Sequence, residues 1–290
     1  MKKSLAILLL FFAAALFLGS QASPVSPLPQ RIISLAPNIT EILFALGLEN
    51  QVIGVTRYCD FPPEALKKEK IGGFIDPNLE KIQSLNPDLI IGFRGNPLRV
   101  INHIKNLNLP VYVLDVGNDL ESVFETIEKI GLITHKEKEA QSLIANLGAK
   151  YSKIEDSLQS VKTRPKVFLS LHGMGLWTCG KESYLNDLIA KAKGVNIAGN
   201  IPKKWLLFTR EQVIHENPDT IIIMTKSEES FRRAKEWFQK ESHLGDVRAV
   251  KEERIYFLDE NISSRFGPRL VEAFEQIALI LHSEQLRRGR

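Results

Sequence analysis

Two glutamates occupy the same place in a phrase that the sequence contains twice. Residues 79–91 read LEKIQSLNPDLII and residues 210–222 read REQVIHENPDTII, so in both a Glu is followed six residues later by Asn-Pro-Asp and an apolar run. Glu80 and Glu211 each fall at the start of an expected helix, where the helix dipole stabilises a carboxylate. Helix stabilisation alone is the simpler interpretation for either residue. The repetition favours a shared role, in which two exposed charges meet a two-fold symmetric partner with two basic pockets.

Aromatic side chains gather in segments that follow expected strands. Large flat apolar ligands are bound by such side chains, with a few polar groups that fix orientation. The alternative is that each aromatic covers the end of a strand as part of the core. Because the set lies beside Gly and Pro in these segments, we favour ligand contact. It comprises Tyr58, Phe61, Phe93, Trp177 and Phe266, with Phe74 and Trp205 just before the two Glu-containing helices.

Other chemistry is weakly indicated. The six histidines are scattered, no pair has the i, i+4 spacing of a helical zinc site, and only His172 falls in an expected cleft loop. The chain lacks a G-x-S-x-G nucleophile turn, a G-x-G-x-x-G motif and a P-loop. We therefore assign no catalytic residue, no metal site in the protein and no resident cofactor.

The N-terminus has the pattern of a secretory signal peptide. Lys2 and Lys3 precede the apolar run SLAILLLFFAAALFLG, and SQA before Ser23 resembles a cleavage site. An uncleaved N-terminal anchor is the alternative. Because no Cys follows the apolar run, we expect residues 1–22 to be removed and the protein to be free in the periplasm rather than lipid-anchored.

Composition and charge narrow the class of protein. The chain has 290 residues, of which 44% are hydrophobic, as in soluble globular proteins. Loss of Lys2 and Lys3 lowers the formal net charge from +4 to +2, so no basic footprint for nucleic acid is present. No second apolar segment approaches the length of a bilayer span.

Strands and helices alternate in two similar halves. Several expected strands are continuously apolar, which favours parallel sheets covered on both faces. In the first half we expect strands at 31–37, 52–56, 88–93 and 110–115 and helices at 38–48, 76–85 and 96–107. In the second half we expect strands at 166–171, 219–224 and 254–259 and helices at 183–194, 209–217, 233–244 and 267–285.

Between the halves, residues 118–162 carry heptad-like apolar spacing and no strand, which predicts one long helix or a broken pair. We therefore predict an α/β fold of two Rossmann-like lobes with mostly parallel sheets, an N-terminal lobe at 23–117, a linker helix at 118–162 and a C-terminal lobe at 163–290. Ligands of open parallel sheets bind beyond the carboxyl ends of the strands. The loops after the strands are thus expected to line a ligand cleft between the lobes.

Several segments together resemble a known family. RIISLAPNITEILFALG, VIGVTRYCDFPPEA, DPNLEKIQSLNPDLIIGFRG, CGKES, TREQV and SSRFGPR are similar to periplasmic cobalamin-binding proteins of vitamin B12 ABC importers. More broadly they resemble the helix-linked, or class III, substrate-binding proteins that serve importers of metal chelates. The likeness covers essentially the whole mature chain. It implies a monomeric carrier that holds a corrinoid in the cleft and delivers it to a permease dimer in the inner membrane.

The resemblance also assigns residues. The ligand contacts it implies fall at Tyr58, Phe74, Phe93, Trp177, Trp205, Asn261 and Arg265. Glu80 and Glu211 would meet arginines on the two copies of the permease. Phe74 and Phe93 stand where familiar members have Trp, and Asn261 where an Asp is familiar. A haem or ferric-siderophore carrier of the same fold therefore stays an alternative. A periplasmic tetrapyrrole chelatase is the alternative from a different class, and no residue is nominated for its catalysis.

The two cysteines depart from the family as well. A pair seen in the C-terminal lobe of some members is absent, and Cys59 and Cys179 fall in segments of opposite lobes, beside Tyr58 and Trp177. A disulfide between them would hold the cleft narrow, and an oxidising compartment permits one. Two free thiols are the favoured alternative, and thiolate ligation of cobalt is a further one.

Overall fold

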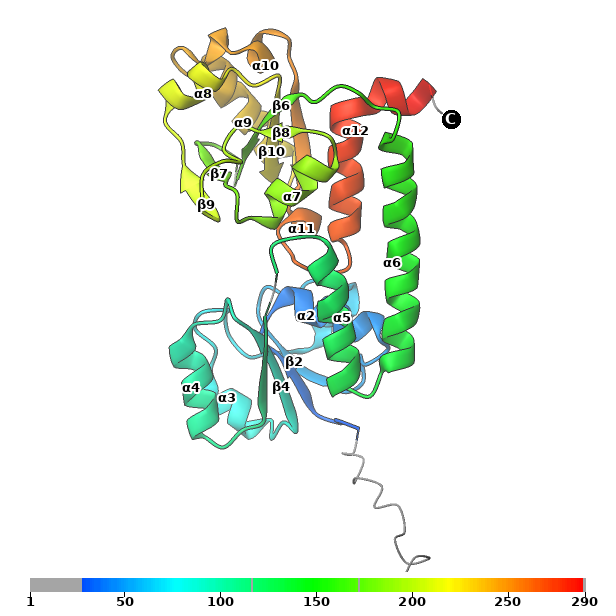
Figure 1. Cartoon of the computed structure of the whole chain (residues 1–290). Helices are drawn as coiled ribbons and strands as arrows, with labels where there is room; N and C mark the ends of the chain where they lie inside the picture. The colour runs from blue at the N-terminus through cyan, green and yellow to red at the C-terminus, as the bar shows by residue number, and fades with distance from the viewer. Residues whose placement is uncertain (1–27, 116, 172, 289–290) are drawn as a thin grey trace, which may run out of the picture.

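The computed structural model describes residues 28–115, 117–171 and 173–288, so the predicted signal peptide lies outside the described residues. Figure 1 shows two α/β lobes, with the long helix α6 (Glu137–Leu158) running beside both. Both main sheets consist of parallel strands. The predicted fold class, two α/β lobes with mostly parallel sheets, is confirmed.

The N-terminal lobe contains a five-stranded sheet. Its strand order is β3-β2-β1-β4-β5, and every neighbouring pair is parallel. The central strand β1 is buried at all three positions, as expected for a parallel sheet with both faces covered. The elements are β1 (Ile32–Ser34), α2 (Pro37–Ala45), β2 (Val52–Val55), η1 (Pro63–Lys67), β3 (Glu69–Lys70), α3 (Leu79–Ser84), β4 (Leu89–Phe93), α4 (Leu98–Asn106) and β5 (Val111–Leu114).

The C-terminal lobe contains a four-stranded parallel sheet in the order β11-β10-β6-β8. The central strand β10 is buried at all six positions. The elements are β6 (Lys166–Ser170), α7 (Tyr184–Lys191), β8 (Val195–Asn196), α8 (Arg210–Glu216), β10 (Thr220–Thr225), α9 (Glu228–Lys240), η2 (Leu244–Asp246), α10 (Arg248–Lys251), β11 (Ile255–Asp259) and α12 (Leu270–Arg288).

Two predicted loops contain short elements. β7 (Trp177–Cys179) and β9 (Trp205–Leu207) form an antiparallel two-stranded ribbon, and α11 (Glu260–Ser263) is a single helical turn after β11. Elements of three or four residues are too short to show a period in the sequence, so periodicity does not detect them.

The segment between the lobes is a broken pair of helices rather than one. α5 (Glu121–Ile133) ends before α6 begins, and His135 between them has a left-handed backbone with φ of 53°. α5 packs against α2 and α6, whereas α6 also packs against α12 of the C-terminal lobe. The 22 residues of α6 span about 33 Å at 1.5 Å per residue. α6 is thus the helix that runs along both lobes, and the lobe boundaries at 118 and 162 stay predictions.

The repeated Asn-Pro-Asp phrase has the same conformation in both lobes. Asn86, just after α3, has a φ of 45°, and Asn217, just after α8, has a φ of 46°. Among residues with a side chain, Asn is one of the few that adopts this left-handed conformation readily, and it commonly ends a helix. The residue that turns the chain away from each helix is therefore the equivalent Asn.

The aspartate of the phrase accepts a hydrogen bond from the start of the first strand in each lobe. A carboxylate oxygen of Asp88 accepts a hydrogen bond from the backbone N–H of Arg31 at 2.9 Å, at the start of β1. Asp219 accepts one from the backbone N–H of Lys166 at 2.8 Å, at the start of β6. The two lobes thus share a real structural repeat.

The lobes also share an apolar core. One buried cluster includes Ile32 of β1, Leu147 of α6, Leu169 of β6 and Phe274 of α12. Because this core passes through both lobes, their relative position depends on packing as well as on the chain connection. Within the described residues, no helix is both long and apolar enough to cross a membrane.

Candidate functional site

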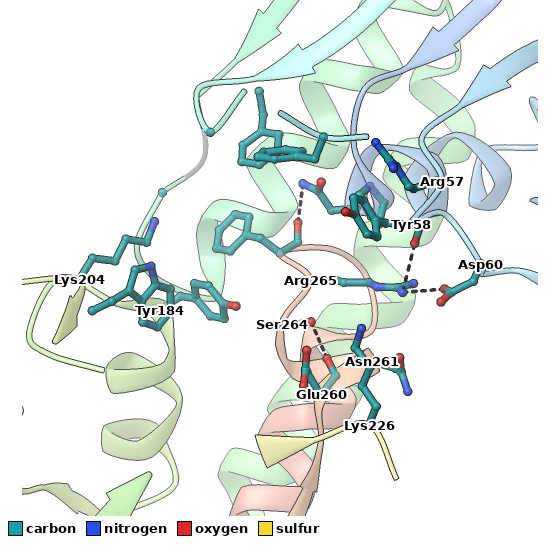
Figure 2. Close-up of a pocket in the computed structure, with 18 residues that line it drawn as sticks. Arg57, Tyr58, Asp60, Tyr184, Lys204, Lys226, Glu260, Asn261, Ser264 and Arg265 are labelled. Atoms are coloured by element: carbon teal, nitrogen blue, oxygen red, sulfur yellow. Dashed lines mark hydrogen bonds and ion pairs between the residues drawn. The ribbon is translucent and has the colours of Figure 1, made fainter. Parts of the chain in front are cut away.

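A cavity of about 680 Å³ opens between the two lobes, lined by residues of both (Figure 2). Its volume lies in the usual range of small-molecule sites. It is bordered by the segments that follow β2, β4 and β11, at the carboxyl ends of parallel strands. Six of the seven predicted ligand contacts line it: Tyr58, Phe74, Phe93, Trp205, Asn261 and Arg265.

The N-terminal lobe contributes a pair of phenyl rings. The ring centroids of Phe74 and Phe93 are 5.1 Å apart, with the planes tilted by 39°. The buried Asn96 positions both residues, because its side-chain oxygen accepts from the backbone N–H of Phe93 at 2.9 Å and its amide donates to the carbonyl of Phe74 at 3.3 Å. One buried amide thus fixes the pair of rings at the cavity wall.

The C-terminal lobe contributes a second aromatic group. The ring of Tyr184 packs edge-on against Trp205 at 6.1 Å and against Phe266 at 5.5 Å between centroids. The Tyr184 hydroxyl donates to the carbonyl of Ser263 at 2.9 Å, and burial raises the pKa of this phenol, so it stays protonated. Sequence reasoning missed Tyr184 because it occupies the first position of α7 and reads as an ordinary apolar helix residue.

Phe61, an aromatic for which ligand contact was favoured, lies outside the cavity lining, and so does the predicted contact Trp177. Trp177 is half-exposed on β7, directly opposite Leu207 of β9. Alternate residues of a strand share a face, so Trp177 lies on the same face of the ribbon as Trp205 but at its opposite end.

Arg265 lines the cavity, but its guanidinium is already paired across the lobes. It donates to Glu41 at 3.1 Å and to Asp60 at 2.6 Å, both in the N-terminal lobe. Arg269 donates to the same Glu41 carboxylate at 2.6 and 3.0 Å. Burial alone would lower the pKa of Arg265, but the hydrogen bonds to Asp60 and Glu41 hold it above its ordinary value. The side chain of Glu41 is only 1% exposed, so this cluster is a buried ionic contact between lobes.

A second contact joins the lobes near α5. The carboxylate of Asp187, on α7, accepts from the backbone N–H of Leu120 at 3.0 Å, at the residue just before α5. Lys191 donates to Glu121 at 2.7 Å. The Glu41 cluster, these contacts and the shared apolar core therefore all join the C-terminal lobe to the rest of the molecule.

The polar groups of the cavity are more basic than acidic. Arg57, Lys204, Lys226 and Arg265 line it together with Asp60 and Glu260. The predicted contact Asn261 also lies there, and its amide donates to Asp259 at 3.0 Å. An electronegative or anionic ligand is therefore better matched to the cavity than a cationic one.

Among the described residues, no group of three or more His, Cys, Asp and Glu side chains is placed to hold a metal ion. His172, the histidine of the expected cleft loop, lies outside the described residues.

The disulfide considered between Cys59 and Cys179 is wrong, because both are free, buried thiols. The Cys59 sulfur lies 3.1 Å from the hydroxyls of both Thr40 and Thr56, and the Cys179 sulfur lies 3.6 Å from the amide of Asn196. Each therefore contacts its own lobe, and neither lines the cavity. Because neither sulfur reaches the cavity, neither can ligate the metal of a chelate that is bound there.

Neither thiol is expected to react in the folded protein. Burial raises the pKa of Cys59 and raises that of Cys179 to about 12, and the thiolate is the reactive form. Ellman's reagent should label both cysteines in guanidinium chloride and leave both unlabelled for hours under native conditions. Rapid native labelling of either thiol, or a denatured protein with no free thiol, would contradict these positions.

The two repeated glutamates are exposed at equivalent helix starts. Glu80 and Glu211 are the second residues of α3 and α8, which Figure 1 places in different lobes on the side away from α6. Asn78 and Thr209 cap the two helices by accepting from backbone N–H groups. The backbone N–H at the helix start, with the Thr209 hydroxyl, lowers the pKa of Glu211, which is therefore ionised at neutral pH.

Two α/β lobes, fixed together by a long helix and enclosing an aromatic cavity, form the architecture of a binding protein that captures a solute. A family model described as a periplasmic binding protein matches residues 32–262, and the chain belongs to that family. It is a family of binding proteins rather than enzymes, and its members are extracytoplasmic substrate-binding proteins of ABC transporters.

Individual relatives share the fold over most of the chain. An uncharacterized ABC transporter substrate-binding lipoprotein of Bacillus subtilis, YvrC, is 29% identical over 256 residues, covering 86% of this chain and 79% of its own. The vitamin B12-binding protein BtuF of Vibrio cholerae has a TM-score of 0.77 at 26% identity, covering 88% of this chain and 97% of that one. The heme-binding protein RhuT of Roseiflexus sp. RS-1 has a TM-score of 0.79 at 27% identity, covering 88% and 99%. The ligands named for these relatives differ, so they define the class of protein and not its ligand.

Proposed function

We propose that the protein captures cobalamin or a related corrinoid outside the cytoplasmic membrane and delivers it to an ABC importer. The observation that carries the proposal is the cavity of about 680 Å³, whose walls are aromatic in both lobes. Phe74 and Phe93 on one side and Trp205 and Tyr184 on the other offer large apolar faces to a broad ring. Burial of such a ring supplies the main favourable free energy of binding.

Haem is the second candidate, and two features favour it. Tyr58 lines the cavity and is 52% exposed, so its phenol is accessible to a ferric iron. The basic side chains of the lining match the carboxylates that a porphyrin carries. The same basic character also keeps a ferric siderophore among the candidates.

We also propose that Glu80 and Glu211 dock the protein onto the permease. Their equivalent helix positions, their exposure and their separation into different lobes fit a partner with two identical basic sites. A monomer then meets a permease dimer with one acid from each lobe. We propose further that the mature protein carries no lipid anchor, since Ser23 and not a cysteine follows the predicted cleavage site.

The aromatic walls give a direct test of the cavity. Replacing Phe74 or Trp205 by Ala, one residue in each lobe, should weaken binding of cyanocobalamin or hemin about tenfold or more, because each change removes a large apolar contact. Fluorescence titration or calorimetry measures the dissociation constants, and absorbance spectra of the purified protein identify a co-purified ring.

The matched control is Tyr256→Ala, an exposed aromatic of the C-terminal lobe that does not line the cavity. It should leave the affinity unchanged. Equal affinity of the wild type and both cavity variants would show that the ring binds elsewhere.

A further inference from the structure

The four basic residues of the cavity differ in whether they already have a partner. Arg57 forms an ion pair with Asp76 at 2.5 Å, and Arg265 is paired with Glu41 and Asp60 as described above. Lys204 has no acid and no hydrogen-bond acceptor for its ammonium group within the described residues. It therefore presents an uncompensated positive charge to the cavity.

Lys204 is held in place by the backbone. Its carbonyl accepts from the N–H of Gly180 at 3.2 Å, and it directly precedes Trp205 at the start of β9. Figure 2 shows Lys204 beside Tyr184 on one side of the cavity, with Arg57, Asp60 and Arg265 on the other.

The environment of Lys204 makes its unpaired charge unfavourable. The side chain is half-buried, and burial lowers its pKa with no opposing partner. Removing an ammonium group from water without a compensating anion costs free energy. Lys226, also in the lining, is exposed, so its ammonium group keeps more of its contact with water than that of Lys204.

We propose that Lys204 determines specificity by binding an anionic group, a carboxylate or a phosphate, on the edge of the ring-shaped chelate that the aromatic walls hold. This inference rests on the proposed function, because it assumes that a ring occupies the cavity. The chelate is then oriented with its anionic edge towards the C-terminal lobe, next to Trp205. A charge-assisted hydrogen bond to Lys204 distinguishes it from the same ring without the anion.

Two pairs of probes isolate that charge. Cobinamide phosphate and cobinamide differ by one phosphate on a corrin, and hemin and its dimethyl ester differ by the two carboxylates on a porphyrin. The wild type should bind the anionic member of at least one pair about tenfold or more tightly than the neutral member. In Lys204→Gln this preference should fall to about twofold or less, while affinity for the neutral ring is retained. The pair that responds identifies whether the anion is a phosphate or a carboxylate.

Lys203→Gln is the control, because this neighbouring lysine is exposed and does not line the cavity. It should keep the full preference, and Lys204→Arg should keep most of it. A wild type that binds a ring without preferring the anionic member, or a preference that survives in Lys204→Gln, would overturn the inference and leave the proposed function standing. A wild type that binds cyanocobalamin but none of the four probes would also overturn the inference alone, and one that binds neither cyanocobalamin nor any of the four probes would overturn both.

Discussion

Replacing Glu41 by alanine is expected to lower the free energy of unfolding by about 3–5 kcal/mol. The carboxylate is buried and accepts from Arg265 and Arg269 of the other lobe, whose side chains are only 12% and 14% exposed. Its removal leaves two poorly hydrated guanidinium groups with Asp60 as the remaining acid nearby. Urea denaturation, analysed for the midpoint and the slope, measures the change.

Two variants make this prediction specific. Glu49→Ala removes an exposed glutamate of the same lobe and should stay within about 0.5 kcal/mol of the wild type. Glu41→Gln keeps an acceptor oxygen and should cost less than the alanine variant. A Glu41→Ala protein as stable as the Glu49→Ala protein would mean that the cluster does not hold the lobes together.

Replacing both Glu80 and Glu211 by alanine is expected to reduce transport strongly and to leave ligand affinity unchanged. Each exposed ion pair with a partner is worth up to about 1 kcal/mol, so loss of two should weaken docking by up to about thirtyfold. Charge reversal to lysine should reduce docking further, because like charges then face each other. Uptake of labelled ligand and binding to the permease in proteoliposomes measure the two effects separately.

The control for docking is the pair Glu49→Ala and Glu228→Ala, which removes one exposed acid from each lobe at other positions. Transport by this control should match the wild type. Normal uptake by the Glu80 and Glu211 double variant would refute the docking role. Weakened ligand binding in that variant would mean that the two glutamates support the ligand site instead.

The sequence predicts the fold well because apolar strands and amphipathic helices can both be recognised in it and alternate along the chain. Continuous apolar strands such as β4 and β10, each followed by an amphipathic helix, leave few arrangements other than parallel sheets. The repeated Asn-Pro-Asp phrase also has a local cause, since Asn86 and Asn217 each end a helix in the left-handed conformation. Signals of this kind depend on neighbouring residues alone.

The sequence does not predict the contacts between lobes. Glu41 stands in the apolar stretch NITEILFALG and gives no sign of its partners, which lie more than 220 residues later. Tyr184 lines the cavity from the start of α7, where it looks like an ordinary core residue. Lys204 lines it from the position just before β9, a strand that is too short to recognise in the sequence. Trp177 shows the converse, because an aromatic in an expected cleft segment lies outside the lining, at the end of the ribbon opposite Trp205.

The claim that the cavity binds a metal-containing ring is tested most directly by calorimetry of the mature protein with cyanocobalamin, hemin and a ferric siderophore. We predict one saturable event with one ligand per protein, strongest with cyanocobalamin, and abolished or greatly weakened when Phe74 and Trp205 are both replaced by alanine. An absence of saturable heat with all three ligands, in a protein that is folded by circular dichroism, would contradict the account.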